Sequence, residues 1–232
     1  MKPTSAQVEY AMMRVKTLFE NDFYKAISYQ KDGKLYYLGC FDWCEDHRNW
    51  LEEQDLFVLR GETKVCIIDT HLEDWVIKIG IRQNPQSLIK QDIDYMALEA
   101  EYYEEAKNAH LEEFFAETYK IGKIEDVDII LQEYACPDED KISDFFFTYA
   151  KSTHEYSPEE YESEDEYLDA VNCIEEEMDT EERVEAIFGD RAEYNDLIEF
   201  IEENEINDLH SGNWGTTKDG RVVIFDFSGY YG

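Results

Sequence analysis

The residues best suited to chemistry lie near the carboxyl end of the chain, within Asn207–Gly229. Asp208 is followed five residues later by Asn213, and Asp226 comes thirteen residues after that, directly behind the apolar run Arg221–Phe225. A loop that holds Asp and Asn, joined to a strand-turn-strand that returns a second Asp, would form a small pocket lined with oxygens. Such ligands suit Mg²⁺, which keeps some waters and takes its other ligands from carboxylates and nucleotide phosphates.

In such a pocket Asp208 would orient a hydroxyl nucleophile and accept its proton. Asp and Asn are also favoured in turns, so for Asp208 and Asn213 taken alone a capping role in the loop is an equal alternative. The second Asp at the end of a strand favours the metal-binding interpretation.

Strands and helices must bring these side chains together, and hydrophobic periodicity indicates where they lie. Strands are expected at 24–44 (two, around a turn at Lys31–Gly33), 57–59, 64–68, 75–79, 128–135 and 221–225. Helical patterns cover 5–20, 91–118 (with a turn near His110) and 194–204, and 206–215 is expected to be a loop. The segment 155–205 holds 22 acidic residues against two cations, Arg183 and Arg191, but its apolar residues still recur at helical spacing.

This order of elements predicts an α+β fold of two lobes with a boundary near 136–140. We expect an N-terminal extension over 1–54, a β-rich lobe over 55–136, and a helical, acidic lobe over 137–232 that carries the loop with Asp208.

The string Asp-Leu-His-Ser-Gly-Asn at 208–213 resembles the catalytic loop of the protein-kinase-like superfamily, most closely its small-molecule and atypical members. Asp-Phe-Ser at 226–228 is similar to the metal-binding Asp-Phe-Gly of that family. The resemblance implies that Asp208 is the catalytic base and that Asn213 and Asp226 hold Mg²⁺. Two short strings, Val-Ile-Lys-Ile-Gly at 76–80 and the loop itself, also resemble the small phage-encoded serine/threonine kinases, whose partners would be host proteins.

The upstream residues extend the resemblance over roughly 55–229. The run at 74–79 is similar to the strand that carries the phosphate-binding lysine, which implies Lys78. Glu99 in the following helical segment would pair with Lys78, and Glu101 is the competing choice by helical phase. The run at 129–135 resembles the strand that leads into the adenine-binding hinge, whose backbone groups would come from Glu133, Tyr134, Ala135 and Cys136.

The chain also departs from the family pattern. Gly61 is the only glycine between the first two strands of the expected lobe, so the glycine-rich phosphate loop is nearly missing. Gly61 is the residue of this loop that the resemblance implies for nucleotide binding. Ile206 and Asn207 stand where many protein kinases have His-Arg, and the sequence ends six residues after Asp226. We therefore expect a reduced second lobe without the usual peptide-binding surface.

The amino-acid composition indicates which classes of partner the protein can bind. The 232 residues carry 56 Asp and Glu against 21 Lys and Arg, a formal charge of −35, yet 43% are hydrophobic. That apolar content predicts a folded core and not a disordered acidic tail. The acidity argues against direct binding to nucleic acid or to anionic lipid, and it favours a basic protein or a cationic small molecule as the partner.

The sequence shows no signal-like apolar stretch at its start and no run long enough to span a membrane. Its five cysteines are irregularly spaced. We therefore expect a cytoplasmic protein with reduced thiols. The leading expectation is an ATP- and Mg²⁺-dependent kinase that transfers phosphate to a hydroxyl, in particular Ser or Thr of a protein. The alternatives are a catalytically weak pseudokinase that acts as a scaffold, and an acidic decoy that mimics DNA and binds DNA-binding proteins.

Overall fold

The structure, a computed structural model, describes most of the chain. The described residues are 2–21, 23–31, 34–41, 45–61, 63–80, 94–124, 127–153, 161, 163, 166–167, 169–170, 173 and 177–228. Parts of four expected features lie outside them: the turn at 32–33, the end of the strand pair at 42–44, the start of the helical pattern at 91–93, and most of the acidic stretch 155–176.

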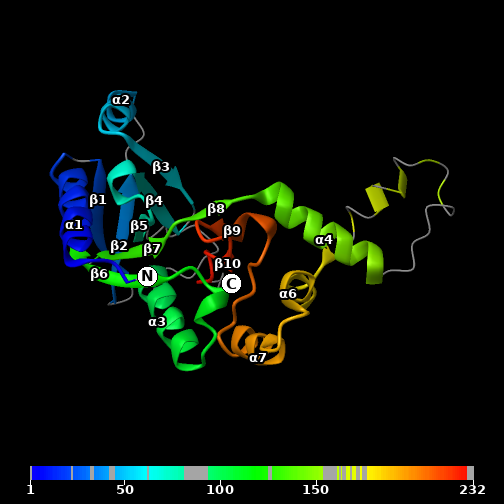
Figure 1. Cartoon of the computed structure of the whole chain (residues 1–232). Coiled ribbons are helices and arrows are strands. Elements are labelled where there is room, and N and C mark those ends of the chain that lie inside the picture. The colour runs from blue at the N-terminus through cyan, green and yellow to red at the C-terminus, as the bar shows by residue number, and fades with distance from the viewer. Residues whose placement is uncertain are drawn as a thin grey trace. The chain divides into compact units, whose positions relative to one another are not determined.

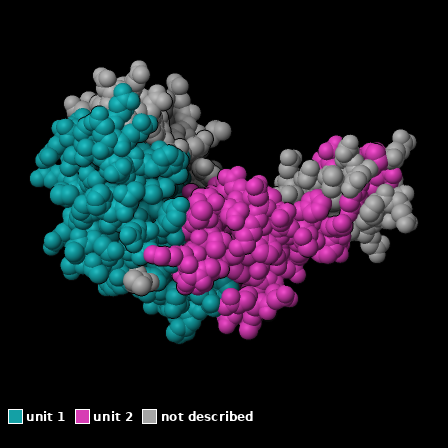
Figure 2. Space-filling view, turned by 45° about the horizontal axis from the view of Figure 1, so that its top comes forward, with its two compact units in different colours: residues 1–134, 230–232 teal, residues 135–229 magenta. Residues whose placement is uncertain are grey.

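The chain divides into two compact units, Met1–Tyr134 with the last three residues, and Ala135–Gly229 (Figure 2). Both units combine helices with antiparallel strands, so the expected α+β class is confirmed. The division comes slightly earlier than the expected boundary. The reason is that Ala135–Pro137 form a strand, β8, which pairs with β9 of the second unit.

A five-stranded antiparallel sheet forms the centre of the first unit, in the order β3-β4-β5-β7-β6 (Figure 1). Its strands are β3 (Leu56–Arg60), β4 (Lys64–Asp69), β5 (Trp75–Gly80), β6 (Thr118–Ile124) and β7 (Val127–Glu133). The predicted strands at 57–59, 64–68, 75–79 and 128–135 therefore exist, the last ending at Glu133.

Alternation along the strands gives this sheet two different faces. One face is the main apolar core, built from Val65, Ile67, Trp75, Ile77, Ile79, Val127, Ile129 and Leu131. The other face carries Lys64, Lys78 and Gln132. Helix α3 (Tyr95–Asn108) lies on this second face, where Met96 and Ala100 cluster with Ile130.

Local backbone and side-chain contacts set where α3 begins and ends. Asp94 caps its first turn, because the Asp94 carboxylate accepts a hydrogen bond from the Ala97 N–H at 3.2 Å. The helix ends at Asn108, and His110 takes a left-handed φ of 61°. The helical pattern expected as far as 118 is therefore wrong beyond this turn, since the chain passes through a short 3₁₀ turn (Glu112–Phe114) into β6.

The segment expected as an N-terminal extension contributes to the core of the first unit. Helix α1 (Ser5–Glu20) begins with a capping box between Thr4 and Gln7, and its buried Ala11, Val15 and Leu18 join the main apolar face of the sheet. A hairpin of β1 (Tyr24–Lys31) and β2 (Lys34–Phe41) follows, then α2 (Glu45–Glu53).

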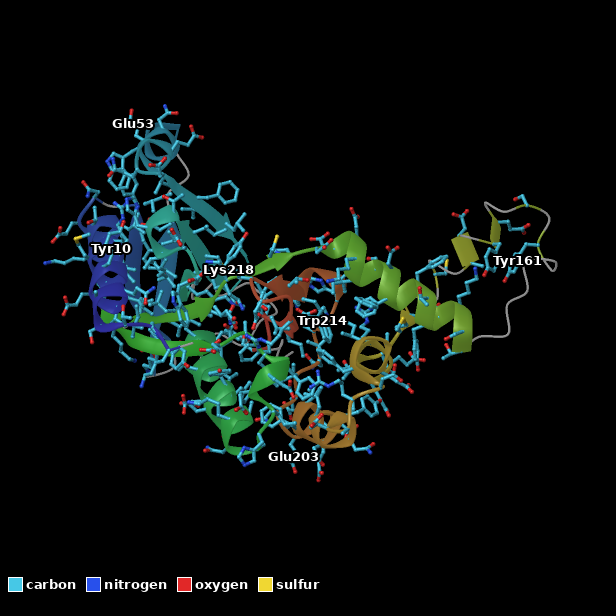
Figure 3. The ribbon with its side chains drawn as sticks, in the orientation of Figure 1. Tyr10, Glu53, Tyr161, Glu203, Trp214 and Lys218 are labelled. Carbon is cyan, nitrogen blue, oxygen red and sulfur yellow. The ribbon has the colours of Figure 1, made fainter. Side chains whose placement is uncertain are left out.

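A buried carboxylate at the end of β4 fastens α1 to the sheet. The Asp69 side chain is fully buried and accepts hydrogen bonds from Arg14 Nε at 2.8 Å and from the Tyr10 hydroxyl at 3.0 Å (Tyr10 is labelled in Figure 3). The His71 N–H donates to the same carboxylate at 2.9 Å. Burial favours the neutral carboxyl, but the hydrogen bonds from His71, Arg14 and Tyr10 outweigh it and hold the pKa of Asp69 below its usual value.

We expect Asp69→Asn to lower the free energy of unfolding by about 1.5–3 kcal/mol at neutral pH, the usual worth of hydrogen bonds to a charged group. Because the folded-state pKa is lowered, this stabilisation is present above the ordinary Asp pKa of about 3.9 and is lost as the pH falls through the folded value. Urea unfolding of wild type and variant at a series of pH values would show the difference in their free energies of unfolding becoming smaller in acid. Glu9→Gln, at an exposed position of α1, is the control and should unfold with the same free energy as wild type.

The second unit has a three-stranded antiparallel sheet in the order β10-β9-β8, with β9 (Trp214–Thr217) in the middle and β10 (Val222–Ile224) beside it. The second unit also contains three described helices: α4 (Glu139–Thr153), α6 (Thr180–Phe188) and α7 (Tyr194–Glu203). Trp214, labelled in Figure 3, is fully buried, and its ring lies 5.7 Å from that of Phe188 and 6.3 Å from that of Phe146. The loop predicted as far as residue 215 is thus shorter, because β9 begins at Trp214.

Close strand approach explains one glycine in this sheet. A Cβ atom at Gly215 would lie 2.9 Å from the Cys136 carbonyl oxygen and 3.0 Å from the Ala135 Cβ. Both neighbours belong to β8, so a side chain could fit only if the strands separated.

Gly215→Ala is therefore expected to lower the stability of the second unit by roughly 1–3 kcal/mol, the usual cost of overpacking. Gly61→Ala is the matched control, since a Cβ there meets its nearest atom at an ordinary 3.5 Å. Thermal unfolding of the two variants would test the difference, and equal melting temperatures would contradict it.

Among the described residues, none of the helices combines the length and the apolar character needed to cross a membrane.

Candidate functional site

A buried ion pair joins β5 to α3 in the first unit. Lys78 Nζ lies 3.0 Å from Glu99 Oε2, and the two side chains are 3% and 0% exposed. Lys78 faces α3 because its neighbours Ile77 and Ile79 point into the opposite, apolar face of the sheet. The helix directs Glu99 toward the sheet together with Met96 and Ala100, whereas Glu101 is exposed. Of the two glutamates left open by the sequence, Glu99 is the partner of Lys78.

Two further side chains reach the same carboxylate, and the sequence analysis missed both. Lys64 Nζ donates to Glu99 Oε1 in a short ion pair, and its side chain is only 5% exposed. The Gln132 amide donates to Glu99 Oε2 at 3.4 Å and to the Thr118 hydroxyl at 2.9 Å. The sequence did indicate the face on which Lys64 lies. Side chains alternate along a strand, so in the run 64–69 Lys64 points to the face opposite the core residues Val65 and Ile67.

Gly61 lies in the turn between β3 and β4, where the phosphate loop was expected. Its N–H donates to the Lys64 carbonyl at 2.9 Å and so closes the hairpin. The Gly61 amide is therefore used within the turn. The conformation does not require glycine either, because an added Cβ would make only ordinary contacts.

The residues expected to form a hinge straddle the division between the units. The Glu133 N–H donates to the Glu117 carbonyl at 2.7 Å and the Tyr134 N–H to the Asp74 carbonyl at 2.9 Å, so both amides are engaged within the first unit. Ala135 and Cys136 start β8 in the second unit, where they pair opposite Thr217 and Thr216 of β9.

The loop with Asp208 is held by contacts to its backbone. The Asn213 side-chain amide donates to the Asp208 carbonyl at 2.5 Å. The Trp214 indole N–H donates to the Leu209 carbonyl at 3.0 Å. His210 has a structural part here, since its Nδ1 accepts the Gly212 N–H at 3.1 Å and caps the short 3₁₀ turn Ser211–Asn213. The Asp208 side chain remains 28% exposed.

Asp226 is brought to the same loop from β10. The Asn213 carbonyl accepts the Phe225 N–H at 3.0 Å and the Asp226 N–H at 3.5 Å. Phe227 and Ser228 are buried and fix the chain directly after Asp226, whose own side chain is half-buried. Asn213 therefore contacts Asp208 through its side chain and Asp226 through its backbone, so the three predicted residues are neighbours within the second unit.

The donor set fits Mg²⁺. The Asn213 Nδ2 points at the Asp208 carbonyl, which leaves Oδ1 as the acceptor of that buried side chain. One amide oxygen and the Asp226 carboxylate would supply hard oxygen ligands, and Mg²⁺ commonly takes only one or two such groups from the protein and completes its shell with water and phosphate. In the described part of the chain no group of three or more His, Cys, Asp or Glu forms a separate metal cluster.

The predicted site residues thus form two groups. Lys78 and Glu99 belong to the first unit, and Asp208, Asn213 and Asp226 belong to the second. Comparisons of this chain with protein-family models, with curated proteins and with solved structures find no match.

Proposed function

We propose that the protein is an ATP-dependent phosphotransferase with a two-lobed, protein-kinase-like fold. In this proposal the first unit is the nucleotide-binding lobe, and the second is a reduced, acidic lobe that carries the catalytic loop. The observation that carries the proposal is the buried Lys78–Glu99 pair at 3.0 Å. A lysine inside a sheet, held by a glutamate from the following helix, is the arrangement that resemblance to kinases implies for phosphate binding.

The chemistry assigned to each residue follows from its atoms. Lys78, aligned by Glu99, binds the α- and β-phosphates. Asn213 and Asp226 hold Mg²⁺, which neutralises charge on the phosphates when bound. Asp208 orients the acceptor hydroxyl. As the acceptor oxygen bonds to the γ-phosphorus and the bond from that phosphorus to the β,γ-bridging oxygen breaks, the hydroxyl proton passes to the Asp208 carboxylate.

The acceptor we propose is a Ser or Thr hydroxyl on a basic protein of the cytoplasm. Charge supports this choice, because 155–205 holds 22 acidic residues and two arginines, a net of −20. A surface of one sign concentrates partners of the other sign and raises their association rate. A cationic small molecule carries the same attraction and is the alternative acceptor.

Binding of Mg·ATP is the first test. A ligand at about 100 times its Kd stabilises the folded state by about 2.7 kcal/mol, so millimolar Mg·ATP should raise the melting temperature by several degrees. Asp226→Asn should abolish the part of the shift that depends on Mg²⁺. Asp196→Asn, at an exposed position of α7, is the matched control and should keep it.

A wild-type protein that shows no shift at millimolar Mg·ATP contradicts the proposal. In that case a salt-sensitive complex with a DNA-binding protein would support the acidic decoy. A shift without phosphate transfer to any basic protein would support a pseudokinase scaffold, for which the engaged Gly61 amide is the favouring observation.

A further inference from the structure

A surface groove lies between α4 and the end of α6 in the second unit, where the two helices are neighbours (Figure 1). Its volume is about 720 Å³. One wall is a stripe of α4 between 141 and 152, in which Phe145, Tyr149 and Ser152 recur at helical spacing and so share one face. The last turn of α6 and the residues directly after it, 185–190, form the other wall.

This groove contains apolar surface that the core of the unit leaves uncovered. On α4, Ile142 and Phe146 are buried, and the Phe146 ring lies 6.3 Å from that of Trp214. Phe145 faces the groove instead and is 36% exposed, one of four large apolar side chains exposed among the described residues. Ile187 lines the opposite wall and is half-buried. Apolar side chains left open to water in a groove are typical of sites that bind another protein.

Carboxylates lie on both walls of the groove. Asp144 belongs to α4, and Glu185 and Asp190 belong to the end of α6, all at exposed positions. Within the part of the chain that the structure describes, none of these three carboxylates forms an ion pair with a lysine or an arginine. Lys141, the cation of the lining, donates its Nζ hydrogen bond to the Thr216 hydroxyl at 3.1 Å. The groove therefore carries a negative charge, which attracts cations.

The end of α6 strengthens this preference for cations. The carbonyl end of a helix carries a partial negative charge, and the last turn of α6 has no basic residue to offset it. The Tyr149 hydroxyl donates a hydrogen bond to the Glu185 carboxylate across the groove, which fixes the position of the carboxylate and leaves its charge in place. Apolar side chains and negative charge thus occur together along one groove.

We propose that this groove is a docking site for a basic segment of the acceptor protein. An apolar side chain of the segment packs against Phe145 and Ile187, and flanking Lys or Arg side chains meet Asp144, Glu185 and Asp190. The inference rests on the proposed function, because it takes the bound protein to be the phosphate acceptor.

The length of the groove suits a peptide. The stripe of α4 from 141 to 152 is about 16 Å long at the helical rise of 1.5 Å per residue. An extended segment covers that length with about five residues, whereas a small cation meets only part of it. The groove also belongs to the unit that carries the loop with Asp208, so docking holds the acceptor on that unit and raises the effective concentration of its hydroxyl.

The test is the binding of three labelled peptides to the full chain without nucleotide, followed by fluorescence anisotropy. One peptide alternates arginine with leucine, the second alternates arginine with serine, and the third alternates glutamate with leucine. The first should bind roughly 10-fold more tightly than either of the others, because only it supplies both charge and apolar side chains. Added salt should weaken its binding.

Variants place this binding in the groove. Phe145→Ala should raise the Kd of the arginine-leucine peptide roughly 10-fold, the usual loss for an aromatic contact at the centre of an interface. Asp144→Asn combined with Asp190→Asn should also raise the Kd and reduce its dependence on salt. Met13→Ala, at a 52% exposed position of α1, is the control for Phe145→Ala and should bind as wild type does.

Asp196→Asn combined with Glu199→Gln removes the same number of charges from exposed positions of α7 and is the control for the double variant. An equal rise of Kd in both double variants would show attraction by net charge alone and overturns the inference while the proposed function stands. Equal binding of the two arginine peptides, or binding of neither, overturns it as well. If Phe145→Ala does not fold, the double variant at 144 and 190 keeps the test.

Phosphate transfer separates this inference from the proposed function. Peptide binding that follows the expected pattern, in a chain that transfers no phosphate to any basic protein, refutes the proposed function and leaves the groove as a docking site. In a chain that does transfer phosphate, the unlabelled arginine-leucine peptide should raise the KM for a basic protein acceptor and leave kcat unchanged. An unchanged KM would show that the acceptor docks elsewhere.

Discussion

Replacing Glu99 with alanine should destabilise the first unit by roughly 3–5 kcal/mol, the cost of removing one side of a buried ion pair. The reason is that Glu99 is the carboxylate shared by Lys64 and Lys78, whose side chains are almost completely buried. Without it, two ammonium groups lose their common partner in an interior of low dielectric. Urea unfolding followed by circular dichroism would measure the loss.

Glu101→Ala is the matched control for this experiment. It removes the same side chain from the same helix two residues later, but at an exposed position, and should change the stability by less than about 0.5 kcal/mol. Similar losses in both variants would show that Glu99 has no special role in the fold. Glu99→Gln should fall between the two, because the amide keeps an acceptor but loses the charge.

Replacing Asp208 with asparagine should reduce phosphate transfer to a basic protein by about 10²–10⁴-fold, the usual contribution of a positioned general base. Stabilisation by Mg·ATP should persist, since Lys78, Asn213 and Asp226 are unchanged. The substitution is mild for the fold. The loop contact from Asn213 goes to the Asp208 backbone carbonyl at 2.5 Å, and this group is present in either residue.

Transfer of ³²P from labelled ATP, together with melting curves in Mg·ATP, would measure both properties. Glu203→Gln, at the exposed end of α7 (Figure 3), is the control and should transfer phosphate as wild type does. Full activity in Asp208→Asn would contradict the assignment of Asp208 as the base. Loss of the melting shift would show instead that Asp208 takes part in nucleotide binding.

Local patterns predicted the parts of the fold that depend on local physics. The helical periodicity of 5–20 predicted α1, and the runs at 64–68, 75–79 and 128–135 predicted three central strands, because one buried face suffices to set the period. Strand β8 was not predicted. It contains Pro137, which is tolerated because β8 lies at the edge of its sheet.

The candidate site was predictable to the extent that its residues follow a motif. Asp208, Asn213 and Asp226 are neighbours in the second unit as the motif implied, and helical phase alone left Glu99 and Glu101 open. Alternation in the run 64–69 separates Lys64 from Val65 and Ile67, but its contact with Glu99 could not be predicted, because the contact depends on the register of β4 against β5 and on where α3 lies across both strands. Register of that kind is set by packing over the whole sheet.

The two ion pairs that Glu99 makes with Lys64 and Lys78 also limit how α3 can move. A helix fixed by one ion pair can swing away at the cost of one broken contact, but α3 is tied through a single carboxylate to two adjacent strands. Any rotation that withdraws Glu99 breaks both ion pairs at once, so intermediate orientations are penalised. We therefore expect α3 to behave as a fixed part of its sheet.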